Sequence, residues 1–333
     1  MAANLQEPMP SPNIELDPLL WNVELPLRHT YHPLGFSVEI ETNSPAVLAG
    51  AEESWGQFQK RFDYPPVHFD ITVINGRSPD CPPLTICRGR HNLMILIADG
   101  ENFAVMHLRQ GRASCWLTQA VAENVGYLRY AFLEAVAPTL LEVQYLTSVH
   151  AACVELNGCG LLLCGDSGAG KSTMAFACAR SGWGFLADDA CKLLRDNGER
   201  VVVGNPHQMR FRESAIELFP ELKQKHVTRR STGKLAIELA TATLPEIRTI
   251  YECPVDYIVF LNRKGTDRPR LSRFPKNEAM QWFEEVITWG DADLRDAHRL
   301  SLRKLLSSEV FELRYSGLTA AVDRLETLVR TGS

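Results

Sequence analysis

The segment from Gly165 to Ser172 has the residue types and the spacing of a polyphosphate-binding loop. Its sequence, Gly-Asp-Ser-Gly-Ala-Gly-Lys-Ser, fits the pattern G-x-x-x-x-G-K-[ST] at every defining position. Glycines allow consecutive backbone N–H groups to turn inward around phosphates, Lys171 can reach the β- and γ-phosphates, and the Ser172 hydroxyl can hold Mg²⁺. The pattern therefore predicts a nucleotide site formed by Gly165, Asp166, Ser167, Gly168, Ala169, Gly170, Lys171, Ser172 and Thr173.

The flanking residues have the patterns of the strand and the helix that such a loop must connect. Gly160 to Cys164 is a short, mostly apolar run that ends at the loop, as a buried strand should. Residues 174–180 are rich in helix formers, and Ser181-Gly182 supplies a helix stop. The alternative is a chance Gly-rich turn, which at ordinary residue frequencies has a probability of roughly one per cent in a chain this long. The context favours nucleotide binding, with a helix N-terminus beside the phosphates.

Two adjacent carboxylates, Asp188 and Asp189, follow a short apolar run over residues 185–187. One helix and one strand separate them from Lys171, so the chain would return them to the carboxyl end of a neighbouring strand, beside the loop. Successive residues at a strand end point to different sides. One carboxylate could then accept the proton of an attacking hydroxyl while the other helps to hold Mg²⁺. The alternative is an aspartate pair that serves only as a turn or a cap.

The rest of the pattern predicts an α/β (α+β) chain with a β-rich N-terminal domain and a P-loop domain. Residues 1–20 carry four prolines and are predicted to be a flexible lead-in. Residues 21–124 are predicted to form the β-rich α+β domain and residues 125–333 the catalytic domain, with Pro138 kinking or breaking a helical stretch. Strands are expected over 36–40, 68–73, 93–98, 103–108, 113–117, 150–156, 160–164, 185–187, 201–203, 257–261 and 310–315, and helices over 44–62, 277–288, 292–307 and 317–330.

The composition excludes several classes of protein. The 333 residues are 45% hydrophobic and 23% charged, as in ordinary globular chains, and the net charge of −5 offers no general attraction to nucleic acid or to an anionic membrane. The nine cysteines form no C-x-x-C pair, and several lie in apolar runs, so small buried hydrophobes are expected. The odd number of cysteines and the polar N-terminus predict a cytoplasmic protein with no nucleic-acid or membrane partner.

His150, the loop segment and Ala187-Asp188-Asp189 together resemble the catalytic half of bacterial HPr kinase/phosphorylase, over about residues 145–205. That family is structurally related to phosphoenolpyruvate carboxykinase, and its more distant members phosphorylate other serine hydroxyls, including those of precursor peptides. The resemblance implies that Asp188 is the catalytic carboxylate, a base in the forward reaction and an acid in reversal. It also implies that Asp189 and Ser172 lie near the metal and that His150 lies close to the reacting phosphate. A strand-end histidine with a structural hydrogen bond is the alternative for His150.

The chain also departs from that family. Thr173 stands where the HPr enzymes commonly have Glu, and the Glu-Ile-Arg-Gly signature is absent. Its nearest equivalent, residues 209–213, places Arg210 and Arg212 on one side of an expected strand, where they could clamp a phosphate or remain as solvated charges. A basic stretch over 223–234 could close over the nucleotide through Arg230 and Lys234, with a solvated loop as the alternative.

These features predict an ATP- and Mg²⁺-dependent kinase that transfers a phosphoryl group to a hydroxyl of a protein serine, a peptide serine or a small molecule. In this hypothesis Asp188, Lys171 and His150 are catalytic, while Ser172 and Asp189 hold the metal. A nucleotide-gated binding module and a plain NTPase are the alternatives. HPr kinases form hexamers, which leaves a homo-oligomer open for this chain.

Overall fold

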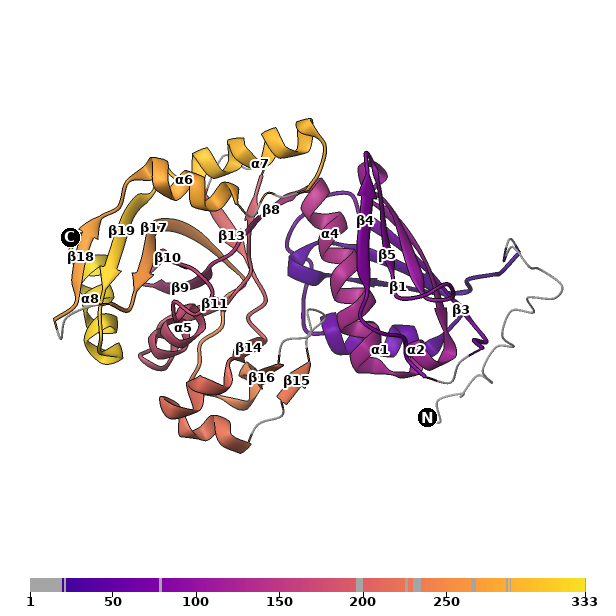
Figure 1. Ribbon diagram of the computed structural model, residues 1–333, viewed down its shortest axis with the longest axis horizontal. Helices are drawn as coiled ribbons and strands as arrows, with labels where there is room; N and C mark the ends of the chain where they lie inside the picture. Colours follow the sequence, from indigo (N-terminus) through magenta and orange to yellow (C-terminus); the bar gives the residue numbers. More distant parts are fainter. Residues whose placement is uncertain are drawn as a thin grey trace. The chain divides into compact units, whose positions relative to one another are not determined.

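The computed structural model describes residues 20, 22–77, 80–195, 200–224, 227–229, 235–264, 268–285, 287 and 289–332 (Figure 1). The chain divides into two compact units, Met1–Gln144 with residues 230–233, and Tyr145–Ser333 without them. The predicted boundary at residue 125 falls inside the first unit. The predicted lead-in, residues 1–20, lies outside the described residues except for Leu20. Both units are mixed α/β, which confirms the predicted class.

The first unit is built on a seven-stranded sheet of order β1-β2-β3-β7-β6-β5-β4. Strands β2, β3 and β7 run parallel, with helix α1 crossing over between β2 and β3, and the remaining neighbours are antiparallel. The predicted meander of residues 93–117 is confirmed as β5-β6-β7. The strands are β1 Leu27–Tyr31, β2 Val38–Thr42, β3 Val67–Ile74, β4 Ile86–Arg90, β5 Leu93–Ile97, β6 Phe103–His107 and β7 Arg112–Thr118.

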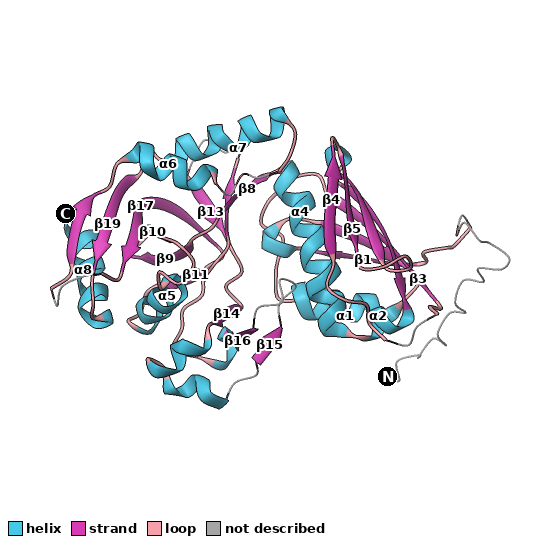
Figure 2. Cartoon of the chain, viewed as in Figure 1, coloured by secondary structure: helices cyan, strands magenta, loops and turns pink. Residues whose placement is uncertain are grey.

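The helices of the first unit pack on one face of this sheet (Figure 2). Helix α1 is Pro45–Trp55, shorter than the predicted 44–62, and α2 is Gln119–Glu123. The stretch predicted to kink or break at Pro138 runs as α3 Val125–Tyr127, a π-helix Leu128–Leu133 and α4 Glu134–Gln144, with Pro138 inside α4. Pro138 has no N–H to bond to the carbonyl of residue 134. This missing bond lies at the point where the π-helix ends and α4 begins.

The second unit is built on a nine-stranded sheet whose path is β11-β9-β10-β17-β13-β12-β8, with β19 on β17 and β18 on β19. Strands β10, β17 and β19 are parallel to one another. The turn Asn157-Gly158, with φ of 54° and 83°, joins β9 to β10 as predicted. The strands are β8 Leu146–Val149, β9 Ala152–Leu156, β10 Cys159–Cys164, β11 Gly184–Ala187, β12 Cys191–Leu194, β13 Val201–Val203, β17 Glu252–Asn262, β18 Arg270–Arg273 and β19 Glu309–Arg314.

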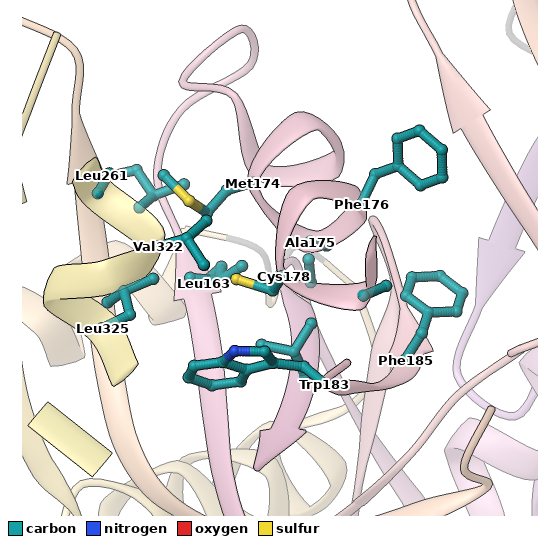
Figure 3. Close-up of a cluster of buried hydrophobic side chains, with 14 of the residues drawn as sticks. Leu163, Met174, Ala175, Phe176, Cys178, Trp183, Phe185, Leu261, Val322 and Leu325 are labelled. Atoms are coloured by element: carbon teal, nitrogen blue, oxygen red, sulfur yellow. The ribbon is translucent and has the colours of Figure 1, made fainter. Parts of the chain in front are cut away.

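Alternating apolar residues of the central strands contribute to two hydrophobic cores, one on each face of this sheet. Leu161 and Leu163 of β10 face a core that contains helices α5 and α8 and the Trp183 ring (Figure 3). Leu162 and Cys164 face the other core, with α6 and α7. A strand buried on both faces is apolar throughout, which explains the continuous Leu run of β10. The helices are α5 Lys171–Arg180, α6 Lys276–Glu284, α7 Ala292–Leu305 and α8 Leu318–Thr331.

A small antiparallel sheet, β14-β16-β15, lies beside these layers and was not predicted beyond its first strand. Its strands are Gln208–Phe211, Leu235–Ala240 and Val227–Arg229. Phe211 of β14 packs edge-on against Phe176 of α5, which ties this sheet to the first helix after the loop. Within the residues that the structure describes, every helix is too short or too polar to cross a lipid bilayer.

Gly160 is a position where any side chain would collide with the central sheet. A Cβ atom there would meet the Pro254 carbonyl oxygen at 1.8 Å, where β10 and β17 shift register. We expect Gly160→Ala to lower the free energy of unfolding by about 1–3 kcal/mol, measured by urea titration. Gly317→Ala is the control, because its Cβ would meet nothing within 4 Å. Equal midpoints for the two variants would contradict the expectation.

Candidate active site

The predicted site residues gather at one edge of the nine-stranded sheet. Strands β10, β17 and β19 are parallel, and β11 runs in the same direction because β10 and β11 are both antiparallel to β9. The carboxyl ends of these four strands therefore meet at the same edge. Such ends are followed by the loop after Cys164, the aspartates after Ala187, Arg263 and Tyr315, and His150 lies there two residues before β9.

The loop from residue 165 to residue 170 connects β10 to α5 and has a backbone that favours glycine. Gly165, Gly168 and Gly170 have φ values of 141°, 94° and 97°. A Cβ on Gly165 would lie 2.8 Å from the Ala169 Cβ, and one on Gly170 would lie 3.1 Å from the Tyr315 hydroxyl oxygen. Helix α5 begins at Lys171, so its first N–H groups open toward the loop. Strand, loop and helix therefore follow one another as the sequence predicted.

Lys171 is almost fully buried, at 6% exposure, and its ammonium group lies against the loop. Its Nζ donates to the carbonyl oxygens of Gly165 at 2.8 Å and Asp166 at 3.4 Å, and lies 3.1 Å from the His150 Nε2. Burial lowers the pKa of Lys171, while the Asp189 carboxylate favours its charged form and opposes that shift. The ammonium thus lies directly behind the cradle that the glycines form.

The two aspartates point to different neighbours, as expected for successive residues at a strand end. Asp188 is 8% exposed, and its Oδ2 accepts a hydrogen bond from the Arg210 backbone N–H at 2.6 Å. The Asp189 Oδ1 lies 3.4 Å from the His150 Nδ1. The Ser172 hydroxyl donates to the Asp188 backbone oxygen at 3.4 Å. Lys171, His150, Ser172 and both carboxylates are therefore brought together within one cluster.

Arg210 and Arg212 prove to have different surroundings: Arg210 lies on β14, and Arg212 directly follows that strand. The Arg210 guanidinium pairs with Glu238 of β16 at 2.9 Å and donates to Gln208 at 2.9 Å, so it stabilises the small sheet. Arg212 donates to the Ser167 hydroxyl at 2.5 Å, and its guanidinium lies beside Gly168. The structure therefore brings only the guanidinium of Arg212 to the loop.

Three predicted residues are not among those of the described cluster, and two residues near the loop were not predicted. Arg230 and Lys234 lie outside the described residues. Thr173 lies in the first turn of α5, partly exposed. Trp282 of α6 was not predicted, and its indole N–H donates to the Asp166 Oδ1 at 3.2 Å. Tyr315 was also missed, although its position directly after a strand that runs parallel to β10 is a signal that the sequence offered.

Comparison with known proteins identifies relatives for the part of the chain that builds this cluster. Residues 142–217 match the family described as HPr Serine kinase C-terminal domain. The HPr kinase/phosphorylase of Shouchella clausii is 25% identical over 253 residues, which cover 75% of this chain and 71% of that protein. That of Bacillus subtilis is 35% identical over 191 residues, covering 57% of this chain and 54% of the relative.

A shorter sequence match is to a protein of the same name. The HPr kinase/phosphorylase of Bordetella pertussis is 37% identical over 76 residues, 23% of this chain and 22% of that protein. A solved structure, the HPr(Ser) kinase/phosphatase from Coxiella burnetii, matches 56% of this chain and 93% of its own with a TM-score of 0.32 and 11% identity. Through these sequence matches, the chain is similar to HPr kinase/phosphorylases, and residues 142–217 are similar to the HPr Serine kinase C-terminal domain.

Proposed function

We propose that this protein transfers the γ-phosphoryl group of ATP to a hydroxyl group of an acceptor, with Mg²⁺ as the metal. The observation that carries the proposal is the cluster at the sheet edge, where a glycine-rich loop, a buried ammonium group and two carboxylates lie close together. A phosphoryl-transfer site needs charge stabilisation on the phosphates and a carboxylate that orients the nucleophile, and little else.

The loop has the form that a triphosphate requires. Its glycine conformations leave no room for side chains on Gly165 and Gly170, so the backbone can approach phosphate oxygens closely. The Lys171 ammonium donates at present to loop carbonyl oxygens, and phosphate oxygens are stronger acceptors that would replace them. The N-terminus of α5 adds a favourable dipole. Residues 165–173 are accordingly the proposed nucleotide site.

Hard oxygen donors beside the loop support a Mg²⁺ site there. Mg²⁺ is usually held by one or two carboxylates together with substrate phosphates and water. Ser172 and Asp189 supply a hydroxyl and a carboxylate at the first turn of α5 and at the end of β11. Bound Mg²⁺ would neutralise charge on the phosphates. The His150 ring next to Asp189 would fix the direction of that carboxylate.

Asp188 is the proposed base. Its Oδ2 accepts a hydrogen bond from the Arg210 backbone N–H, which fixes the orientation of the carboxylate that would receive the proton of an acceptor hydroxyl. Proton removal by Asp188 would occur as the hydroxyl oxygen attacks the γ-phosphorus and the bond to ADP breaks. The proposed acceptor is a serine of HPr, because the relatives carry the name HPr kinase/phosphorylase. Another protein or peptide serine and a small-molecule hydroxyl are the alternatives.

The test is a transfer assay with a defined acceptor set. The protein is incubated with Mg²⁺ and γ-labelled ATP, together with purified HPr, a library of serine peptides and a metabolite pool. The proposal predicts label on a hydroxyl oxygen of one acceptor, located by mass spectrometry. Release of free phosphate alone would identify a plain NTPase, and ATP binding without turnover would identify a nucleotide-gated module. Either result overturns the kinase proposal.

Arg210 and Arg212 make a matched pair for testing the nucleotide site. We expect Arg212→Gln to weaken ATP binding several-fold without changing the unfolding midpoint, because it removes a charge beside Ser167 from the loop. We expect Arg210→Gln to lower the free energy of unfolding by about 1–3 kcal/mol, because it removes the ion pair between Arg210 and the largely buried Glu238, which is 12% exposed. Calorimetric titration with ATP and urea unfolding measure the two effects, and equal behaviour of the variants contradicts both.

A further inference from the structure

One face of the sheet in the first unit carries an apolar patch that the helices do not cover. The buried residues of β3, β6 and β7 alternate with side chains that point to the opposite face. On that face the register aligns apolar side chains across four strands, among them Phe103 and Trp116, whose rings stack at 5.0 Å. This open-face patch consists of Ile86, Leu93, Ile95, Ile97, Phe103, Val105 and Trp116.

The patch reaches the edge of the sheet at β4. All five residues of β4 are exposed, with Ile86 at 50%, and Leu93 of β5 is exposed at 46%. Among the described residues β4 has β5 as its only strand neighbour, so its outer backbone groups face away from the sheet. Exposed apolar residues that continue to a strand edge are typical of a surface that accepts another strand.

The same edge is locally basic in a chain whose net charge is −5. Arg88 and Arg90 alternate with Cys87 and Gly89, so both arginines share the face of the open-face patch. Beside them lies a cavity of about 540 Å³, whose lining includes Arg88, Arg90, His91, Leu93, Ile95 and His107.

These charges decide between two occupants. Pairing of β4 with β4 of a second copy would bring four arginines together across one ladder, and like charges directly opposite each other destabilise a sheet. An acidic segment has the complementary charge and would be attracted. We propose that β4 binds an acidic, extended segment of a partner protein as an added strand, whose apolar side chains cover the open-face patch. This inference goes beyond the proposed phosphoryl transfer and does not depend on it.

The test uses a peptide of about ten residues with alternating Glu and Val, and a matched peptide with Lys in place of Glu. Hydrogen exchange of the full chain is followed with and without each peptide, and affinity is measured by fluorescence anisotropy. The Glu peptide is expected to slow exchange at residues 86–90, whereas the Lys peptide does not. The double variant Arg88→Glu/Arg90→Glu should weaken binding roughly tenfold or more, and the neutral Arg88→Gln/Arg90→Gln should lie between.

Arg28→Glu is the control, because Arg28 is an exposed arginine on β1, at the opposite edge of the same sheet. It should bind the Glu peptide as the unaltered chain does. Three results overturn the proposal: protection outside β4 or nowhere, equal binding of the two peptides, or protection of β4 that rises with protein concentration in the absence of peptide. The last would identify a second copy as the occupant.

Discussion

Asp188→Asn is expected to lower the rate of phosphoryl transfer by roughly 10²–10⁴-fold while ATP still binds with nearly unchanged affinity. The amide keeps the size of the carboxylate and an oxygen that can accept the Arg210 N–H, so the site should keep its shape. It cannot take a proton from an acceptor hydroxyl. Label transfer and calorimetric ATP binding measure the two quantities separately.

A second aspartate variant shows whether the loss is specific. Asp256 accepts a hydrogen bond from the Gly160 N–H, at the end of β10 remote from the loop. Asp256→Asn removes a carboxylate from the same sheet and should transfer phosphate at close to the normal rate. Transfer by Asp188→Asn within tenfold of the unaltered chain would exclude Asp188 as the base. Loss of ATP binding by that variant would instead indicate a structural role.

The features that sequence analysis predicted correctly are those with local causes. A backbone position that needs a positive φ favours glycine, so the sequence itself indicates such positions. Gly165, Gly168 and Gly170 all have positive φ angles. The short strand before Asp188 was predicted because a strand buried on both faces is apolar throughout. One helix and one strand separate Lys171 from this pair of aspartates, and this spacing predicted that both carboxylates lie at the sheet edge that carries the loop.

The features that were missed depend on tertiary contacts. Arg210 and Arg212 have the same spacing pattern, and only the position of Glu238 on β16 assigns one to the small sheet and leaves the other at Ser167. Trp282 reaches Asp166 from a helix that follows β18, and no local pattern marks that residue. The helical pattern of residues 125–145 was predicted, but its π-helical turn directly before α4 was not. Local pattern cannot supply such information.

Lys171→Met is expected to abolish the stabilisation that ATP gives to the folded chain. At an ATP concentration 100 times its Kd, bound nucleotide should stabilise the unaltered protein by about 2.7 kcal/mol, and so raise the unfolding midpoint of the second unit by roughly 5–10 °C. Methionine fills a similar volume but has no charge for the phosphates, so thermal scans of the variant with and without ATP should coincide. Its midpoint without ATP should stay the same or rise, because a desolvated ammonium is removed. Lys304→Met, at an exposed position of α7, should keep the full shift. A full ATP-dependent shift in Lys171→Met would show that the loop at residues 165–172 does not bind the triphosphate.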